Sequence, residues 1–270
     1  MRKVEERIKW TGNEYSFVDE PDVTKFNDLV LGRFGGNSSA GQYKNEDGCL
    51  IWADGDKQWE FVLLLDAHKT AESAELVANW VQQGETDLHK LLNHKIHSTY
   101  FKELENYFVS LFEETRFLDA CRSVQGETAC LIAVRKEKYL WWFSVGDCLL
   151  YLFHPELMKL GQYAVNQRQF FEWVGAVNTF GQAVPCYSSG TRELRQGENH
   201  VFLTTDGLVE CPGLPFADPK AIVKSFEGAT NEQGVEKLLK TIQEHGVRDS
   251  TTIVSWNIKR KETAAMPSDQ

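Results

Sequence analysis

The chain has 270 residues, which can form one large domain or two small ones. Hydrophobic residues make up 42% of it and aromatic residues 12%, enough for a substantial core and too many for a disordered chain. The formal net charge of -10 argues against nucleic acid or an anionic membrane as a partner, because both favour a basic protein face.

The sequence also carries signals about location. Residues 1–7 lack the apolar stretch of a signal peptide, and no apolar run approaches the roughly 20 residues that span a bilayer. The six cysteines form no CxxC pair, and several lie in apolar runs, which is typical of free buried thiols in a reducing compartment. We therefore expect a cytoplasmic protein with no membrane contact, and we expect a monomer.

The first part of the chain is rich in strand signals. Residues 28–32 predict a short strand, and residues 49–53 and 59–66 predict a hairpin around an Asp-Gly-Asp turn. Helical signals follow, because alanine and valine recur at helical spacing in residues 71–82. A second helical stretch covers about residues 87–115 and could contain a break.

The second part returns to strands and ends with helices and a strand. The predicted strands are 128–134, 139–145, 148–153, 201–205 and 251–258. The predicted helices are 219–226 and 231–244. Residues 155–185 carry mixed signals and indicate an irregular insertion. This order predicts an α+β fold, with mainly antiparallel sheets packed face to face and covered by helices. We expect a single domain over residues 1–258 and a disordered polar tail over residues 259–270.

Four aspartates stand at the ends of apolar strands. Asp66 and Asp206 each close one, whereas Asp47 and Asp249 stand just before one. A carboxylate in such a place costs free energy unless a cation or hydrogen bonds stabilise it. Four of them in one small domain suggest oxygen ligands that converge on hard divalent metal ions, which favours metal-assisted hydrolysis.

Each acidic residue also has a structural interpretation when it is taken alone. Asp66 and Asp206 could cap the turns or helices that follow them, and Asp47 could be a turn or capping residue. Asp249 could be a surface carboxylate, and Asp147, after a glycine, is a natural hairpin-turn residue. Only their joint order along the chain favours the metal site.

Six short motifs carry a resemblance to a known family. In chain order they are Asn45-Glu46-Asp47, Asp66-Ala67-His68, Gly126-Glu127-Thr128-Ala129, Val145-Gly146-Asp147-Cys148, Thr205-Asp206-Gly207-Leu208 and Arg248-Asp249-Ser250-Thr251-Thr252. Together they resemble the metal-dependent protein serine/threonine phosphatases of the PP2C type, and the bacterial members in particular, over residues 36–256. One motif alone is weak, but six in the family's order are specific.

The resemblance implies an α-β-β-α sandwich, flanked by helix pairs, with two Mn²⁺ or Mg²⁺ ions at one end of the sheets. Asp66 would bridge the two ions, and Asp206 and Asp249 would complete one of them. The carbonyl of Ala67 would bind the other ion, together with Glu46 or Asp47, directly or through water.

Further roles follow from the same resemblance. A metal-activated bridging water would attack the phosphate of a phosphorylated protein, and His68 would be the general acid for the leaving alkoxide. Asp147 and Glu210 could hold a weaker third ion.

Three positions depart from the family's pattern. Ala67 replaces a glycine, which matters only if its φ is positive. Lys69 and Thr70 replace a Gly-Gly pair and bring a positive charge near the site. Gln42 stands where bacterial members have a phosphate-binding arginine, so a bidentate contact would be lost. Lys44, Lys69 or Arg33 could partly replace it.

The leading hypothesis is therefore a metal-dependent phosphatase that acts on phosphoserine and phosphothreonine in proteins. A catalytically weak binding or regulatory module that keeps its metal is the alternative; Gln42 and Lys69-Thr70 favour it, whereas the retained acidic residues argue against it. A hydrolase of small phosphorylated molecules is a third interpretation. The irregular segment 155–185 could form a flap over the cleft.

Overall fold

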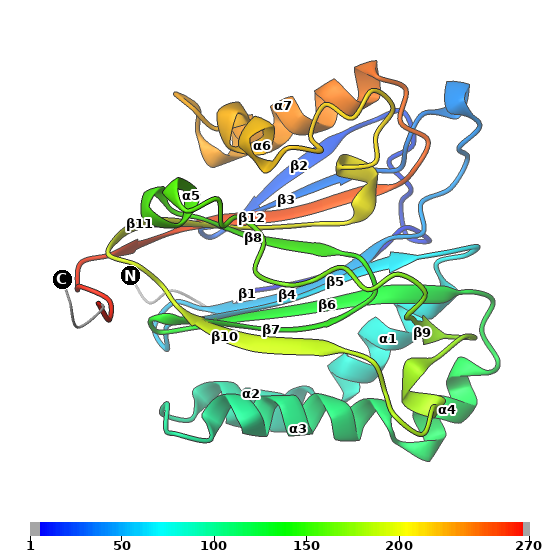
Figure 1. The fold of residues 1–270 in the computed structure, drawn as a ribbon. Coiled ribbons are helices and arrows are strands. Elements are labelled where there is room, and N and C mark those ends of the chain that lie inside the picture. Colours follow the sequence, from blue (N-terminus) through cyan, green and yellow to red (C-terminus); the bar gives the residue numbers. More distant parts are fainter. Residues whose placement is uncertain (1–5, 267–270) are drawn as a thin grey trace.

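The central strands bury the side chains of both their faces. Every residue of β4 (Gly48–Asp54) and β5 (Trp59–Ala67) is buried. Such strands need a packed layer on each side. The computed structural model, which describes residues 6–266, provides a second sheet on one side and helices on the other (Figure 1). The predicted α+β class and its α-β-β-α sandwich are confirmed.

Both sheets are antiparallel throughout. The larger one has the order β1-β4-β5-β6-β7-β10, and β9 pairs with β6. Its further strands are β1 (Glu6–Thr11), β6 (Glu127–Lys136), β7 (Tyr139–Val145), β9 (Val174–Gly175) and β10 (Ser188–Glu193). The smaller sheet has the order β2-β3-β12-β11-β8. Its strands are β2 (Asp22–Phe26), β3 (Leu29–Phe34), β8 (Leu149–Phe153), β11 (Gly197–Thr204) and β12 (Thr251–Arg260).

Helices cover the outer face of each sheet (Figure 1). Those on the larger sheet are α1 (Glu72–Gln83), α2 (Glu85–Asn93), α3 (Tyr100–Phe112) and α4 (Thr115–Cys121). The smaller sheet is covered by α6 (Pro219–Ser225) and α7 (Asn231–Glu244). The helical stretch predicted at 87–115 is therefore divided between α2 and α3, so that four helices form the first layer. Helix α7 starts where Thr230 and Gln233 form a capping box.

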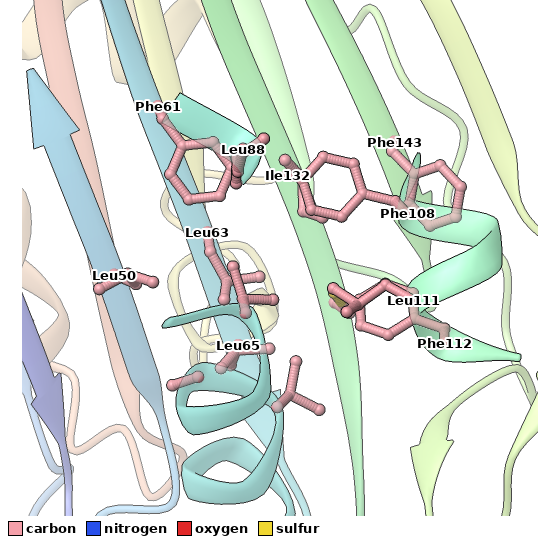
Figure 2. Close-up of a cluster of buried hydrophobic side chains, with 14 of the residues drawn as sticks. Leu50, Phe61, Leu63, Leu65, Leu88, Phe108, Leu111, Phe112, Ile132 and Phe143 are labelled. Atoms are coloured by element: carbon pink, nitrogen blue, oxygen red, sulfur yellow. The ribbon is translucent and has the colours of Figure 1, made fainter. Parts of the chain in front are cut away.

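Three layers of buried side chains hold the sandwich together. One lies between α1–α4 and the larger sheet, where Figure 2 shows Phe61, Leu63, Phe108 and Phe143 packed together. A second lies between the sheets, and a third lies under α6 and α7. Each large apolar side chain buried in this way contributes about 1.5–3 kcal/mol. The six cysteines are free, and all except Cys186 are buried.

The segment predicted to be irregular contains only short elements. They are α5 (Pro155–Lys159), β9 and the 3-10 helix η2 (Thr179–Gly181). Two further 3-10 turns are η1 (Ser38–Ala40) and η3 (Asp206–Leu208). Strand β12 continues to Arg260, two residues past the expected end of the domain, and residues 267–270 of the expected tail lie outside the described part. Within residues 6–266, no helix combines the length and apolar character needed to cross a membrane.

Candidate functional site

Three aspartates converge where strands of both sheets end. Asp66 is the second-last residue of β5, Asp147 lies in the turn after β7, and Asp206 opens η3 after β11. One carboxylate oxygen from each lies within 4.8 Å of the other two. Within residues 6–266, this is the one group of three His, Cys, Asp or Glu side chains whose potential ligand atoms lie this close together. The antiparallel order explains this, because β5, β7 and β11 all finish at the same edge of the sandwich (Figure 1).

Two motif glycines let the loops at this edge approach one another. Gly126 has φ of +98°, and a Cβ there would lie 2.0 Å from the carbonyl oxygen of His68. A Cβ on Gly207 would lie 2.2 Å from the carbonyl oxygen of Ser250. Any larger residue would push apart the loops that carry the candidate ligands.

The carboxylates lie in an environment that disfavours their charge. Burial, and then the neighbouring Asp206, raise the pKa of Asp66 well above its usual range. Burial, and then Asp249 and Asp147, raise the pKa of Asp206 to about 7. The Oδ1 atoms of Asp47, Asp147 and Asp206 are buried, with no hydrogen-bond donor among the described residues. Carboxylate oxygens without donors fit a divalent cation as their missing partner.

Asp47 lies behind this group and faces the second sheet. Its side chain is buried, and its Oδ2 accepts hydrogen bonds from Thr252 Oγ1 at 2.7 Å and Thr205 Oγ1 at 3.1 Å. The free Oδ1 is the atom that remains for an ion or a water. The structure thus brings Asp47 close to the site while one of its oxygens is used to join the sheets.

A cleft of about 570 Å³ opens beside the aspartates. Its lining includes the candidate residues Glu46, Ala67, His68, Asp249 and Glu210. The remaining lining residues are Gln42, Lys44, Lys69, Pro212, Val247 and Arg248. All the predicted site residues therefore lie either in the aspartate group, in this cleft or, for Asp47, directly behind.

The positions that depart from the family's pattern have specific surroundings. Ala67 lies within β5 and is not among the residues with positive φ, so a glycine is not needed there. Lys69 has φ of +76°, a strained conformation for a residue with a side chain. The ammonium of Lys44 donates to the carbonyl of Lys69 and lies 2.7 Å from Glu46 Oε1. The buried Gln42 donates to Glu46 Oε2 at 3.3 Å.

The proposed substitutes for the missing arginine divide into two groups. Lys44 and Lys69 line the cleft. Arg33 instead pairs with Asp22 and lies over the ring of Phe17, at 4.4 Å from its centre, and it is not part of the lining.

Three residues of the site were not singled out from the sequence. Arg248 lines the cleft beside Asp249, and its place inside the last motif could have indicated it. Trp173 meets the ring of His68 edge to face, at 6.3 Å between centres. Arg168 reaches three of the carboxylates. The last two come from the irregular segment, where no local pattern marks them.

The fold was compared with those of known proteins. No family model matches the sequence, and no curated protein is similar enough in sequence to count as a match. Solved structures do match. Serine/threonine phosphatase Stp1 from Staphylococcus aureus is 15% identical, with a TM-score of 0.62, over 88% of this chain and 97% of that one.

Two further structures agree with this result. A bacterial serine phosphatase is 15% identical, with a TM-score of 0.64, over 87% of this chain and 99% of that one. RsbX in complex with magnesium is 13% identical, with a TM-score of 0.58, over 88% of this chain and 100% of that one. The chain therefore has the fold of the bacterial PP2C-type serine/threonine phosphatases.

Proposed function

We propose that this protein is a metal-dependent phosphatase that removes phosphate from serine and threonine side chains of proteins. The observation that carries the proposal is the group of Asp66, Asp147 and Asp206, with carboxylate oxygens within 4.8 Å of one another, beside a cleft that Ala67, His68 and Asp249 line. The fold, which the chain shares with solved serine/threonine phosphatases, supports it. In this proposal both sheets belong to one domain, because residues of both build the site.

The residues suit two divalent ions, Mn²⁺ or Mg²⁺. Burial and the neighbouring carboxylates of Asp206, Asp47, Asp249 and Asp147 all raise the pKa of Asp66, which supports a place for it between the ions. We assign to it the bridge between the ions. Asp206 and Asp249 would complete one ion, and the Ala67 carbonyl with Glu46 or Asp47 would complete the other. Oxygen ligands of this kind are those that hard divalent cations prefer.

The metal ions, when bound, would neutralise the phosphate dianion and lower the pKa of the attacking water. His68 would donate the proton that the leaving serine or threonine oxygen needs. Its position supports this role, because it lines the cleft and Trp173 contacts its ring edge to face. The main chain of His68 is fixed by a 2.7 Å hydrogen bond from its N–H to the carbonyl of Glu127.

The phosphate itself would be held by Lys69 and Arg248. Both line the cleft, and neither forms a hydrogen bond or ion pair from its side chain with a described residue. The ammonium of Lys44, in contrast, forms an ion pair with the carboxylate of Glu46. Two cations without a partner beside a carboxylate group, in a chain of net charge -10, support binding of an anion here. They would compensate for Gln42, which stands at the usual position of the phosphate-binding arginine.

A second candidate is a regulatory module that binds a phosphorylated partner and keeps its metal without turnover. It is favoured by Gln42, which is buried and donates to Glu46 and therefore does not supply a cation. The small-molecule hydrolase lacks a comparable observation in its favour.

The test is phosphate release from a phosphothreonine peptide and from a small aryl phosphate. Asp206→Asn is compared with Asp119→Asn, a control in which the aspartate side chain is 61% exposed on α4 and pairs with Arg122. We expect turnover of the peptide that needs Mn²⁺, stops with EDTA, survives Asp119→Asn and falls by at least about 100-fold in Asp206→Asn.

The other outcomes separate the candidates. Mn²⁺ binding without phosphate release would support the regulatory module. Fast turnover of the small ester with none of the peptide would support the small-molecule hydrolase. Peptide turnover that persists in EDTA would contradict the metal centre.

A further inference from the structure

An arginine side chain enters the group of carboxylates. Arg168 Nη2 lies 2.6 Å from Glu210 Oε1, 3.5 Å from Asp206 Oδ2 and 3.6 Å from Asp147 Oδ2. Its Nε donates to the main-chain carbonyl of Asp147 at 3.1 Å. Asp147 and Asp206 belong to the three converging aspartates. One guanidinium thus contacts each carboxylate that the resemblance assigns to a weaker third ion.

The main chain around Arg168 is fastened to the turn that carries Asp147. The side chain of Asn166 accepts a hydrogen bond from Leu150 N at 2.8 Å and donates to the Cys148 carbonyl at 2.8 Å. On the other side, the N–H of Gln169 donates to the Gly146 carbonyl at 2.8 Å. Contacts on both sides of residue 168 hold its main chain beside the turn that carries Asp147.

The charge of Arg168 is permanent. A guanidinium stays protonated throughout the accessible pH range, and three carboxylates lie around this one. Its guanidinium group also lies over the ring of Phe170, with 4.7 Å between the guanidinium carbon and the ring centre. The guanidinium faces the Oδ2 atoms of Asp147 and Asp206 and donates to Glu210, so it supplies positive charge to the same three carboxylates that a third ion would need.

We propose that Arg168 is a built-in cation that takes the place of a third metal ion beside Asp147, Asp206 and Glu210. This inference rests on the proposed function and limits its metal centre to two ions. Arg168 acts as a positioning residue, because it holds Asp147 and Asp206 in place at any metal concentration. It also ties residues 166–169 to the edge of the site, so this part of the expected flap stays closed over the carboxylates.

The experiment counts Mn²⁺ ions by calorimetric titration of the whole protein after removal of metal with EDTA. The variants are Arg168→Ala, Arg168→Lys and the control Arg195→Ala. The control is closely matched: Arg195 lies 2.7 Å from Glu156, with side chains 21% and 52% exposed, and Arg168 lies 2.6 Å from Glu210, with side chains 21% and 51% exposed. Arg195 is not among the residues that line the cleft.

We expect two ions in the wild type, in Arg195→Ala and in Arg168→Lys, which keeps the charge. Arg168→Ala should bind a third, weaker ion, because its carboxylates lose their cation. Limited proteolysis should also cut residues 162–173 at least about threefold faster in Arg168→Ala than in Arg195→Ala.

Two results would overturn the inference while leaving the metal-dependent phosphatase intact. One is a third ion bound by the wild type with Arg168 in place, a measurement that does not depend on any variant folding. The other is a count of two ions in folded Arg168→Ala. Binding of no Mn²⁺ by any of the proteins would overturn the proposed metal centre and this inference together.

Discussion

Thr252 Oγ1 lies 2.7 Å from Asp47 Oδ2, and this hydrogen bond joins the two sheets behind the candidate metal site. Asp47 stands just before β4 of the larger sheet, and Thr252 belongs to β12 of the smaller one. Both side chains are buried. The contact explains how two sheets, with separate cores on their outer faces, keep the ligands of one centre in register.

Removal of this hydroxyl should destabilise the protein. Thr252→Val keeps the shape of the side chain but leaves Asp47 with Thr205 as its remaining hydroxyl donor. We expect a loss of about 1.5–3 kcal/mol in the free energy of unfolding, because a buried carboxylate loses a charge-assisted bond. Urea unfolding measures it. Thr241→Val is the control, since Thr241 donates to the Lys237 carbonyl within α7. Equal losses in both variants would contradict the assigned importance of the Thr252 contact.

Metal-free protein should become less stable as pH rises. The pKa of Asp206 is about 7 in the fold because of burial and then Asp249, against about 3.8 when the chain is unfolded. Between these two pKa values, the folded state therefore keeps a proton on Asp206 that the unfolded chain has lost. The stabilisation from this proton is fully present below about pH 4 and is lost as pH rises through 7.

Thermal unfolding in EDTA at pH 6 and pH 8 checks this behaviour. We expect a lower melting temperature at pH 8 in the wild type, a smaller difference in Asp206→Asn, and a large rise with Mn²⁺ only in the wild type. In EDTA at pH 8, Asp206→Asn should be at least as stable as the wild type, because the substitution removes like-charge repulsion. A variant that is clearly less stable without metal would contradict this account.

Lys69 should lower the stability of the fold while its charge strengthens substrate binding. Its φ of +76° suits glycine, so Lys69→Gly should relieve strain and raise the free energy of unfolding by about 1 kcal/mol. The same change removes a cation that we place at the phosphate, so KM for a phosphopeptide should rise by about tenfold. Lys69→Met separates the two effects, because it removes the charge and keeps the strain. A KM unchanged in both variants would remove Lys69 from the phosphate site.

His200 should make the protein sensitive to acid. Its ring packs 4.5 Å from that of Phe226, and Nε2 lies 2.7 Å from Ser255 Oγ. Loss of hydration lowers the pKa of His200 to about 4. The unfolded chain takes up this proton near pH 6.5, so the stability that the neutral ring provides is present above pH 6.5 and is lost as pH falls toward 4.

The measurement is the free energy of unfolding between pH 7 and pH 4.5 for the wild type and His200→Gln. We expect the wild type to lose about 1 kcal/mol more per pH unit across this range. Parallel curves would mean that His200 does not titrate as described.

The sequence predicted the strands that carry ligands better than the strands at the edges. Residues 59–66 and 201–205 are nearly continuous apolar runs, and they match β5 and the second half of β11. Strand β10, Ser188–Glu193, has no large apolar residue, and its strand character comes from pairing with β7. β1 and β2 were also missed, because each mixes charged and apolar residues in a short run; β1 pairs with β4, about 40 residues further along the chain, and β2 pairs with the neighbouring β3.

The residues of the site also differ in how far the local sequence could predict them. The aspartates could be predicted because each is tied to a strand end and to the order of motifs. Arg168 and Trp173 could not, because they lie in a segment without periodicity and meet the site only through tertiary contacts. The side-by-side position of Asp147 and Asp206 is another such contact, since it depends on how the two sheets pack.

The most direct test of the central claim is the rate of phosphate release from one phosphothreonine peptide, with saturating Mn²⁺, by the wild type and by Asp66→Asn. After burial, the other four aspartates of the site all raise the pKa of Asp66. We predict steady turnover by the wild type and a rate at least about 1000-fold lower in the folded variant. Equal rates in the two proteins, or no release by a wild type that binds Mn²⁺, would contradict the claim that this group of carboxylates is the centre of a phosphatase.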